Sequence, residues 1–362
     1  MSKASRPSFI DDLVPLILES TEHWWTRDYA RLAQVSPAWA YYVQKRLYFC
    51  PTLYSFDACA SLARSLLQQP SLKHLMNGIE LRPTHEEGRG RLTDEHFESI
   101  RALLALPGLR RVVIGGQLAM KAERFLNALA YPETITELVV DGGSIASSIP
   151  LSSLELDECL FYRFPSLRTL KLANLQELEI VMPPPSQFTI PISNLIINNV
   201  AITGGYLCSI LDSSSLDFLS ISAKSAAEYD EELRLILGCC RVNMLHYAVE
   251  TSSHSPGRSF LDVDGVDTLS LQKLQLDGLS IDPGLFLDLQ RRCPSLKELG
   301  VSGRSVGISP REWATFAASR TLPCLTKLKL PGGTNNPPYA KWKADDFHVL
   351  QSICISHEVQ LA

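Results

Sequence analysis

Pro165-Ser166-Leu167-Arg168-Thr169-Leu170-Lys171-Leu172 is the stretch that decides the fold. The same string, proline-x-leucine-x-x-aliphatic-x-aliphatic, recurs at residues 107–114, 294–301 and 323–330. In each copy the proline ends the preceding helix, because it lacks the N–H that a helix interior requires, and the leucine enters the core. The alternation of apolar and polar residues that follows predicts a short strand with one buried face.

The shorter triple aliphatic-x-x-aliphatic-x-aliphatic extends this pattern over most of the chain. Start-to-start spacings of 24, 26, 25 and 29 residues separate several neighbouring copies. This arrangement resembles the leucine-rich repeat family. The resemblance implies an α/β fold, an irregular solenoid in which a curved parallel sheet carries helices on its outer side. Ten regular copies begin at Leu109, Ile135, Leu151, Leu167, Leu175, Ile192, Leu216, Leu271, Leu296 and Leu325, and two poorer copies begin at Met76 and Val242.

Helices are predicted between several of these strands. Thr93 precedes a stretch that runs to Leu106, a second stretch covers residues 228–237, and Asp282-Pro283 and Ser309-Pro310 each pair a capping residue with a proline. In the centre, spacings of 16 and 8 residues leave no room for a helix, so we expect an irregular outer side there. The asparagine position of the family is matched by Asn174 and Asn198.

The first fifty residues differ from the rest and predict three short helices. Residues 10–20 and 26–35 carry apolar side chains at helical spacing. Ser36-Pro37 supplies a cap and a first helical residue for a third helix that holds Trp39, Val43 and Leu47. A unit of this size has a small core, so we expect it to lean on the first repeat or on a partner.

The string Leu32-Ala33-Gln34-Val35-Ser36-Pro37-Ala38-Trp39 resembles the most recognisable segment of the F-box motif. The apolar helix from Leu13 to Leu18 lies upstream, as in that motif, although the usual leucine-proline pair is here interrupted as Leu13-Val14-Pro15. The resemblance implies docking on the Skp-type adaptor of a cullin–RING ubiquitin ligase. The motif positions that contact the adaptor fall on Leu13, Pro15, Ile17, Leu18, Val35 and Trp39.

Together the two resemblances imply a non-catalytic substrate-recognition subunit, with an F-box-like unit in residues 1–50, a junction helix in 51–71 and a repeat solenoid in 72–362. The alternative is a protein–protein interaction scaffold whose helical N-terminus only caps the solenoid. The apolar face of residues 13–18 separates the two hypotheses: a docking face is exposed in the free chain, and a cap is buried.

Composition fits an ordinary folded protein. The 362 residues include 34 Lys and Arg against 39 Asp and Glu, for a formal net charge of −5. This balance argues against nucleic acid as the main ligand. Apolar runs stay well short of the roughly 20 residues that cross a bilayer, and the start lacks a signal-peptide pattern. Nine scattered cysteines without metal spacing predict reduced thiols, no cofactor and an intracellular protein, cytoplasmic or nuclear.

One catalytic pattern matches, the G-x-S-x-G string at residues 303–307 with Ser305 in its centre, followed by Asp345, Asp346 and His348 in hydrolase order. A nucleophile elbow enters its helix directly after the serine, whereas here Ser309 restarts the chain with a fresh cap. We therefore expect no enzyme.

Two weaker motifs are also expected to be structural. Residues 262–267 lack the ligands of a calcium loop and predict a turn at Asp264-Gly265. Cys239-Cys240 ends a helix, where packing is the expected role.

Polar strand positions are expected to line the concave face of the solenoid and to hold the substrate. The middle strands contribute acidic residues there, with Glu137, Glu155, Glu177 and Glu179, whereas the C-terminal strands are basic. We therefore expect a partner with an acidic patch to dock near the C-terminal lysines. The candidate substrate-binding residues are Arg110, Arg111, Lys171, Lys273, Lys297, Lys327 and Lys329.

Overall fold

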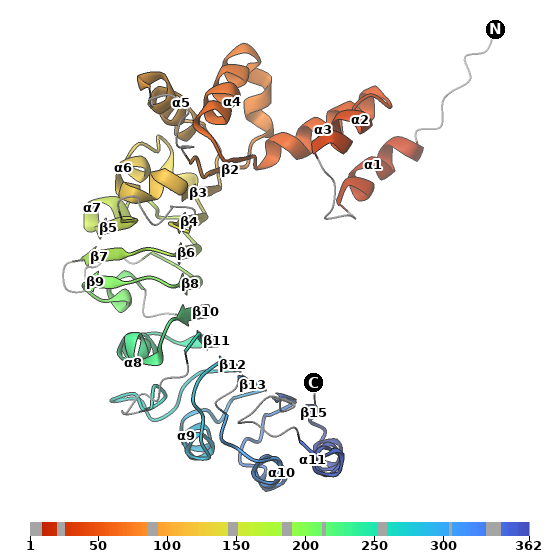
Figure 1. Cartoon of the computed structure of the whole chain (residues 1–362), viewed down its shortest axis with the longest axis vertical. Helices are drawn as coiled ribbons and strands as arrows, with labels where there is room; N and C mark the ends of the chain where they lie inside the picture. Colours follow the sequence, from red (N-terminus) through yellow and green to blue (C-terminus); the bar gives the residue numbers. More distant parts are fainter. Residues whose placement is uncertain are drawn as a thin grey trace.

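The computed structural model describes residues 9–19, 26–84, 93–143, 151–182, 190–211, 215–251, 259–303, 306–330 and 342–361. Its dominant feature is a parallel sheet of twelve strands that bends into an open arc (Figure 1). In spatial order the strands are β1 (Thr52–Leu53), β2 (Gly78–Leu81), β3 (Arg111–Gly115), β4 (Glu137–Asp141), β6 (Thr169–Ala173), β8 (Asn194–Asn198), β10 (Leu216–Ala223), β11 (Val242–Val249), β12 (Lys273–Asp277), β13 (Glu298–Ser302), β14 (Lys327–Lys329) and β15 (Gln360–Leu361).

All twelve aliphatic triples of the sequence fall on strands, so the α/β expectation is confirmed at the level of a large parallel sheet with helices. In the main sheet the register aligns the second and third aliphatic residues of the triples into two continuous rows. Leu170 pairs with Leu138 on one side and with Leu195 on the other, and Leu172 pairs likewise with Val140. These rows are buried beneath the outer elements, and replacing one such leucine by alanine costs roughly 2–5 kcal/mol in a packed core.

Helices cover the outer side of the arc at both ends (Figure 1). Two of them begin with the predicted caps: Thr93 and Ser309 each form a capping box with the residue three positions later. The helices beyond the first fifty residues are α4 (Phe56–Gln68), α5 (Asp94–Leu104), α6 (Ala122–Asn127), α7 (Glu158–Phe161), α8 (Asp230–Cys239), α9 (Gly284–Arg292), α10 (Pro310–Ser319) and α11 (Ala344–Ser356).

The outer side of the central repeats carries a second, three-stranded parallel sheet, β5 (Ser153–Asp157), β7 (Glu177–Val181) and β9 (Ile202–Gly204). The expectation of an irregular outer side is therefore wrong. The closely spaced triples belong to two interleaved arrays: Leu151 and Leu175 are 24 residues apart, and Leu167 and Ile192 are 25 apart. Within each array, neighbouring strands are one ordinary repeat length apart. The short central spacings are therefore distances between a strand of one sheet and a strand of the other.

Three helices precede the arc, α1 (Phe9–Glu19), α2 (Thr26–Leu32) and α3 (Pro37–Phe49). Val14, Leu18 and Val43 form their shared apolar cluster, which is separate from the core beneath the main sheet. The three helices project from the end of the arc, and α3 connects them to it (Figure 1). The C-terminal end of α3 lies against the 3-10 turn Pro70–Leu75 of the first repeat. Among the described residues, α3 provides the main contact between this unit and the arc.

Close approach of neighbouring repeats makes one glycine critical. Gly278, after β12, has φ +75°, and a Cβ atom there would lie 2.1 Å from the carbonyl oxygen of Val249 on β11. Gly265 has nearly the same φ, +72°, but open space around it. Gly265→Ala should cost about 1 kcal/mol from the backbone conformation alone. Gly278→Ala should cost several kcal/mol, because β11 and β12 must separate.

Urea unfolding followed by circular dichroism measures this difference, with Gly265→Ala as the matched control. Equal shifts in the two unfolding midpoints would contradict the close packing of β11 against the turn after β12.

Candidate functional site

The helical unit carries the first candidate surface, and most of its predicted adaptor-binding residues are accessible. Leu13 and Ile17 are each 38% exposed and Val35 is 64% exposed, while Pro15 and Trp39 are half-buried. An apolar side chain that faces solvent on a unit with so small a core gains nothing for folding. The expectation for a docking face, exposure in the free chain, is met by Leu13 and Ile17.

Two residues of this surface differ from the prediction. Leu18 is only 2% exposed, because it packs with Val14 and Val43 inside the helical unit, so its assignment as a contact residue is wrong. Leu16, which was not assigned to the surface, is 61% exposed. Residues 14 and 18 are four apart and share one face of α1; residue 16 lies on the opposite side, and residues 13 and 17 flank the buried face. The helical period of this segment is therefore enough to predict that Leu18 is buried and that Leu16 is exposed.

The concave face of the main sheet is the second candidate surface. Strand residues that alternate with the buried rows point to it, and Arg111, Lys171, Lys273, Lys327 and Lys329 lie on it as predicted. Arg110 and Lys297 lie one residue earlier, at the edge where their strands begin, and both are exposed. The expected acidic middle is wrong: Glu155, Glu177 and Glu179 belong to β5 and β7 of the outer sheet.

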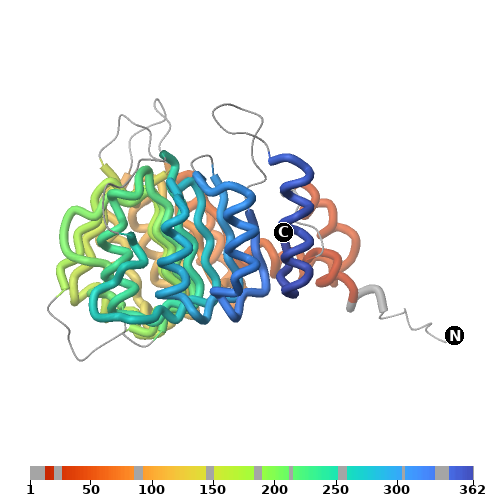
Figure 2. Tube along the Cα trace, turned by 90° about the horizontal axis from the view of Figure 1, so that it is seen from below, coloured from red at the N-terminus to blue at the C-terminus, as the bar shows by residue number. Residues whose placement is uncertain are grey.

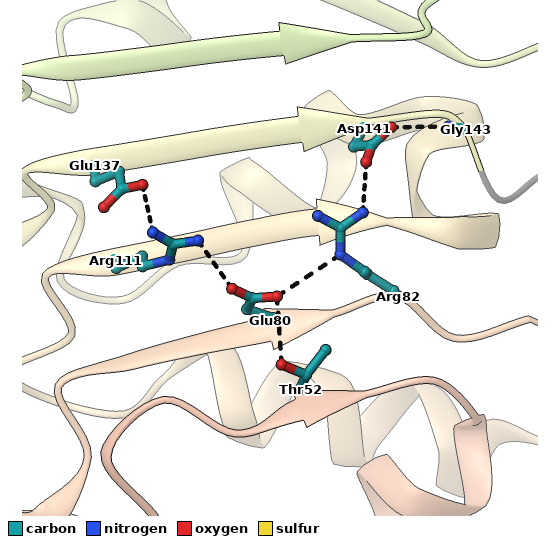
Figure 3. Close-up of polar contacts among 7 residues, drawn as sticks. All are labelled: Thr52, Glu80, Arg82, Arg111, Glu137, Asp141 and Gly143. Carbon is teal, nitrogen blue, oxygen red and sulfur yellow. Dashed lines mark hydrogen bonds and ion pairs between the residues drawn. The ribbon is translucent and has the colours of Figure 1, made fainter. Parts of the chain in front are cut away.

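Arg111 is held in a network of ion pairs that crosses the N-terminal half of the concave face (Figure 3). Its guanidinium contacts Glu137 at 2.6 Å and Glu80 at 2.9 Å. Arg82 also approaches Glu80, and it reaches across β3 to Asp141 at 2.5 Å. This reach is possible because Gly115 has no side chain in its path: a Cβ atom there would lie 3.0 Å from Cγ of Arg82.

The network leaves no excess positive charge on this half of the surface. Its three carboxylates and two guanidiniums bind one another, and the side chains of Glu80, Arg82 and Asp141 are about one-fifth exposed. Val113 and Val139 lie on the same face and are fully buried beside them. Arg111 is therefore committed to Glu80 and Glu137, which corrects its assignment as a residue free to meet an acidic partner.

The network continues as a ladder at the carboxyl ends of the strands. Asp141 accepts hydrogen bonds from the side chain of Asn174 and the N–H of Gly143, both at 2.9 Å, and Asn174 in turn accepts one from Asn199. Asn174 and Asn199 both have φ near +50°, a conformation that asparagine tolerates better than most residues. Asn199, and not Asn198 as expected, is the residue that repeats the role of Asn174. A hollow of about 730 Å³ lies here, lined by the segments that follow the main-sheet strands.

The C-terminal half of the concave face is open. A hollow of about 350 Å³ lies over β11 to β14. Lys273 forms an ion pair with Glu298 at 2.7 Å, whereas Lys327 and Lys329 have no ion-pair partner in the described part of the chain. Lys297 donates a hydrogen bond to Gln272 at 3.0 Å, outside the hollow. The polar and charged side chains that line the hollow are His246, Lys273, Gln275, Glu298, Lys327 and Lys329.

Ser220, His246 and Asp277 form a hydrogen-bonded chain across three adjacent strands beside this hollow. The imidazole of His246 lies 3.2 Å from the Ser220 hydroxyl and 2.7 Å from the Asp277 carboxylate. These residue types also make up hydrolase triads, but Ser220 is 6% exposed and sits in mid-strand, where the sheet occupies the backbone N–H groups that an oxyanion site needs. The chain orients His246 and joins three strands.

Asp277, at one end of that hydrogen-bonded chain, is held by several hydrogen bonds. Burial would raise its pKa, but hydrogen bonds from Ser302, Gln275 and His246 outweigh burial and hold the pKa below its ordinary value. Asp277 is therefore a carboxylate at neutral pH.

The other catalytic candidates gain no support in the described residues. Ser305 and Arg304 lie outside them. Within the described ranges, no group of three or more His, Cys, Asp or Glu side chains is placed to hold a metal ion. Asp264-Gly265 forms the predicted turn. A hydrogen bond with Cys208 lowers the pKa of Cys239, but the hydrogen bond with Cys240 and burial raise it to about 12, which disfavours the reactive thiolate.

No protein-family model matches the chain, and a search of curated proteins found no relative. Among the described helices, none has the length and apolar character needed to pass through a bilayer.

Asp141 links the ion network to the asparagine ladder and makes stability depend on pH. Burial alone would raise its pKa, but hydrogen bonds from Asn174, Arg82 and the Gly143 N–H lower it. A depressed pKa contributes stability above the unfolded value of about 3.9, and this contribution is lost as the pH falls through the folded value. Asp141→Asn should therefore cost about 2 kcal/mol at pH 7, and little below pH 3.

Thermal unfolding between pH 3 and pH 7 tests this expectation, with the exposed Asp217→Asn as the control. A destabilisation by Asp141→Asn that is equal at both ends of the pH range would contradict it.

Proposed function

We propose that this chain is a non-catalytic substrate-recognition subunit of a Skp–cullin–F-box type ubiquitin ligase. The observation that carries the proposal is the exposed apolar surface of α1, formed by Leu13, Leu16 and Ile17, on a helical unit that projects from the arc. Their exposure, together with the F-box-like string at residues 32–39, supports docking on a Skp-type adaptor. The repeat arc, read as leucine-rich repeats, would hold a protein substrate on its concave face.

The proposed mechanism is proximity. A substrate held on the arc and a ubiquitin-charged enzyme held through the adaptor react as if they were parts of one molecule, which raises the effective concentration of the attacking lysine. No side chain of the arc has to take part in the chemistry. The mutually paired charges of the N-terminal network and the open C-terminal hollow accord with a binding role for this surface.

The alternative, a scaffold whose N-terminal helices only cap the solenoid, requires the apolar side of α1 to be covered by the first repeat. The helical unit instead forms its own cluster and meets the arc at the end of α3. These observations favour the docking role.

Co-purification with a recombinant Skp-type adaptor tests the proposal. The wild-type chain should retain the adaptor, and the double variant Leu16→Asp, Ile17→Asp should lose at least about tenfold in affinity, because two buried apolar contacts become desolvated charges. Leu18 is not a suitable target, since its substitution would unfold the helical unit.

Leu287→Asp on α9 is the matched control, since Leu287 is 70% exposed and lies on the outer side of the arc. Circular dichroism should show that all variants are folded. Failure of the wild-type chain to bind the adaptor, or equal loss in Leu287→Asp, would refute the docking role.

A further inference from the structure

The C-terminal hollow carries an excess of positive charge in a chain that is acidic as a whole. Three lysines and one glutamate line it, a net charge of +2 with His246 neutral, against −5 for the full sequence. Lys273 is compensated by Glu298, so the excess lies on Lys327 and Lys329. Both are on β14, two residues apart on the same face, which places their backbone origins about 7 Å from each other.

An apolar strip adjoins the charged part. Met244 lines the hollow on β11, and Phe218 lies beside it on β10, in register. On β8 the residue in register with Phe218 is Asn194, and Ile196 lies two residues further along, in register with Ser220. The side chains of Met244, Phe218 and Ile196 are half-buried on the concave face, where the neighbouring positions are polar. A ligand that fills the hollow thus meets two ammonium groups at one end and an apolar strip at the other.

The floor of the hollow depends on Gly300. At this position of β13 a Cβ atom would lie 1.8 Å from Oε1 of Gln275, whose side chain occupies the space above the glycine. Any larger residue displaces Gln275 and reduces the hollow without changing its charge.

The distance between the apolar strip and the two lysines sets the distance between the apolar and acidic groups of a matching ligand. From β11 to β14 there are three strand intervals of about 4.8 Å, or about 14 Å in all. An extended peptide that crosses the strands advances about 3.3 Å per residue, so about four residues span the distance. Two ammonium groups on separate positions match two carboxylates better than the compact oxygens of a single phosphate.

We propose that this hollow binds an extended protein segment in which an apolar side chain lies about four residues from a pair of acidic side chains. The segment would rest its apolar residue on Met244 and Phe218 and its carboxylates on Lys327 and Lys329. This proposal rests on the ligase function proposed above, and it names the class of substrate that the arc would select.

Fluorescence anisotropy of labelled peptides with the full chain tests the proposal. The peptides are Gly/Ser-based and carry one leucine and an Asp-Glu pair, separated by one, four or eight residues, and a fourth peptide carries phosphoserine in place of the pair. The four-residue spacing should bind at least about tenfold more tightly than the others, and binding should weaken with salt.

Three variants locate the site. Lys327→Glu with Lys329→Glu should abolish binding, and Gly300→Val should weaken it at least about tenfold without a change of charge. The double variant Lys121→Glu, Arg124→Glu is the matched control, because it reverses two charges at exposed residues at the start of α6, away from the hollow. Equal loss in this control, equal affinity at all three spacings, or tighter binding of the phosphoserine peptide would overturn the proposal.

The same variants in the adaptor co-purification separate this proposal from the previous one. They should retain the adaptor, since the substitutions lie on the arc. Absence of peptide binding with the adaptor still bound would overturn only the substrate class. Peptide binding without adaptor binding would confirm the hollow as a docking site and overturn its assignment to a ligase.

Discussion

The parallel stacking of aliphatic rows is the constraint on which the molecule depends. A single strand with its outer element buries too little apolar surface to fold alone, so each repeat is stable only between two neighbours. The register that aligns Leu170 with Leu138 and Leu195 also fixes every intervening residue on the concave face. The sheet therefore determines the functional surface as well as the core, because a shift of one residue would exchange the two.

Much of this architecture is readable from the sequence. The aliphatic triples located every one of the twelve strands they were assigned to, and the helix caps at Thr93 and Ser309 formed as predicted. The outer sheet of β5, β7 and β9 was not predicted. An aliphatic triple indicates a strand with a buried face, but it does not indicate which strand pairs with it. The signal for the outer sheet was the 24-residue interval between Leu151 and Leu175, hidden by the triple at Leu167 that belongs to the other array.

The charge of the concave face was harder to predict, because acidic and basic side chains of neighbouring repeats form ion pairs with one another. Glu80 and Glu137, the partners of Arg111, are 31 and 26 residues away, and the glutamate that pairs with Lys273 is 25 residues away. A list of cations along the chain shows none of these pairs until the register is known. Lys327 escapes compensation for a local reason: Glu298, its neighbour on β13, is bound to Lys273, and its neighbour on β15 is the uncharged Gln360.

The two halves of the concave face thus have different physical roles. On the N-terminal half, the mutually satisfied ion pairs tie β2, β3 and β4 together, and they stiffen the part of the arc nearest the helical unit. On the C-terminal half, Lys327 and Lys329 have no ion-pair partner among the described residues, so an outside anion would stabilise this surface. The arc is open on one side, and its two ends lie on that side (Figures 1 and 2). A segment bound over β11 to β14 would therefore lie across this opening from the helices that precede β1. Under the proposed function, the separation between these two regions would set the effective concentration of a bound substrate near the ubiquitin-charged enzyme.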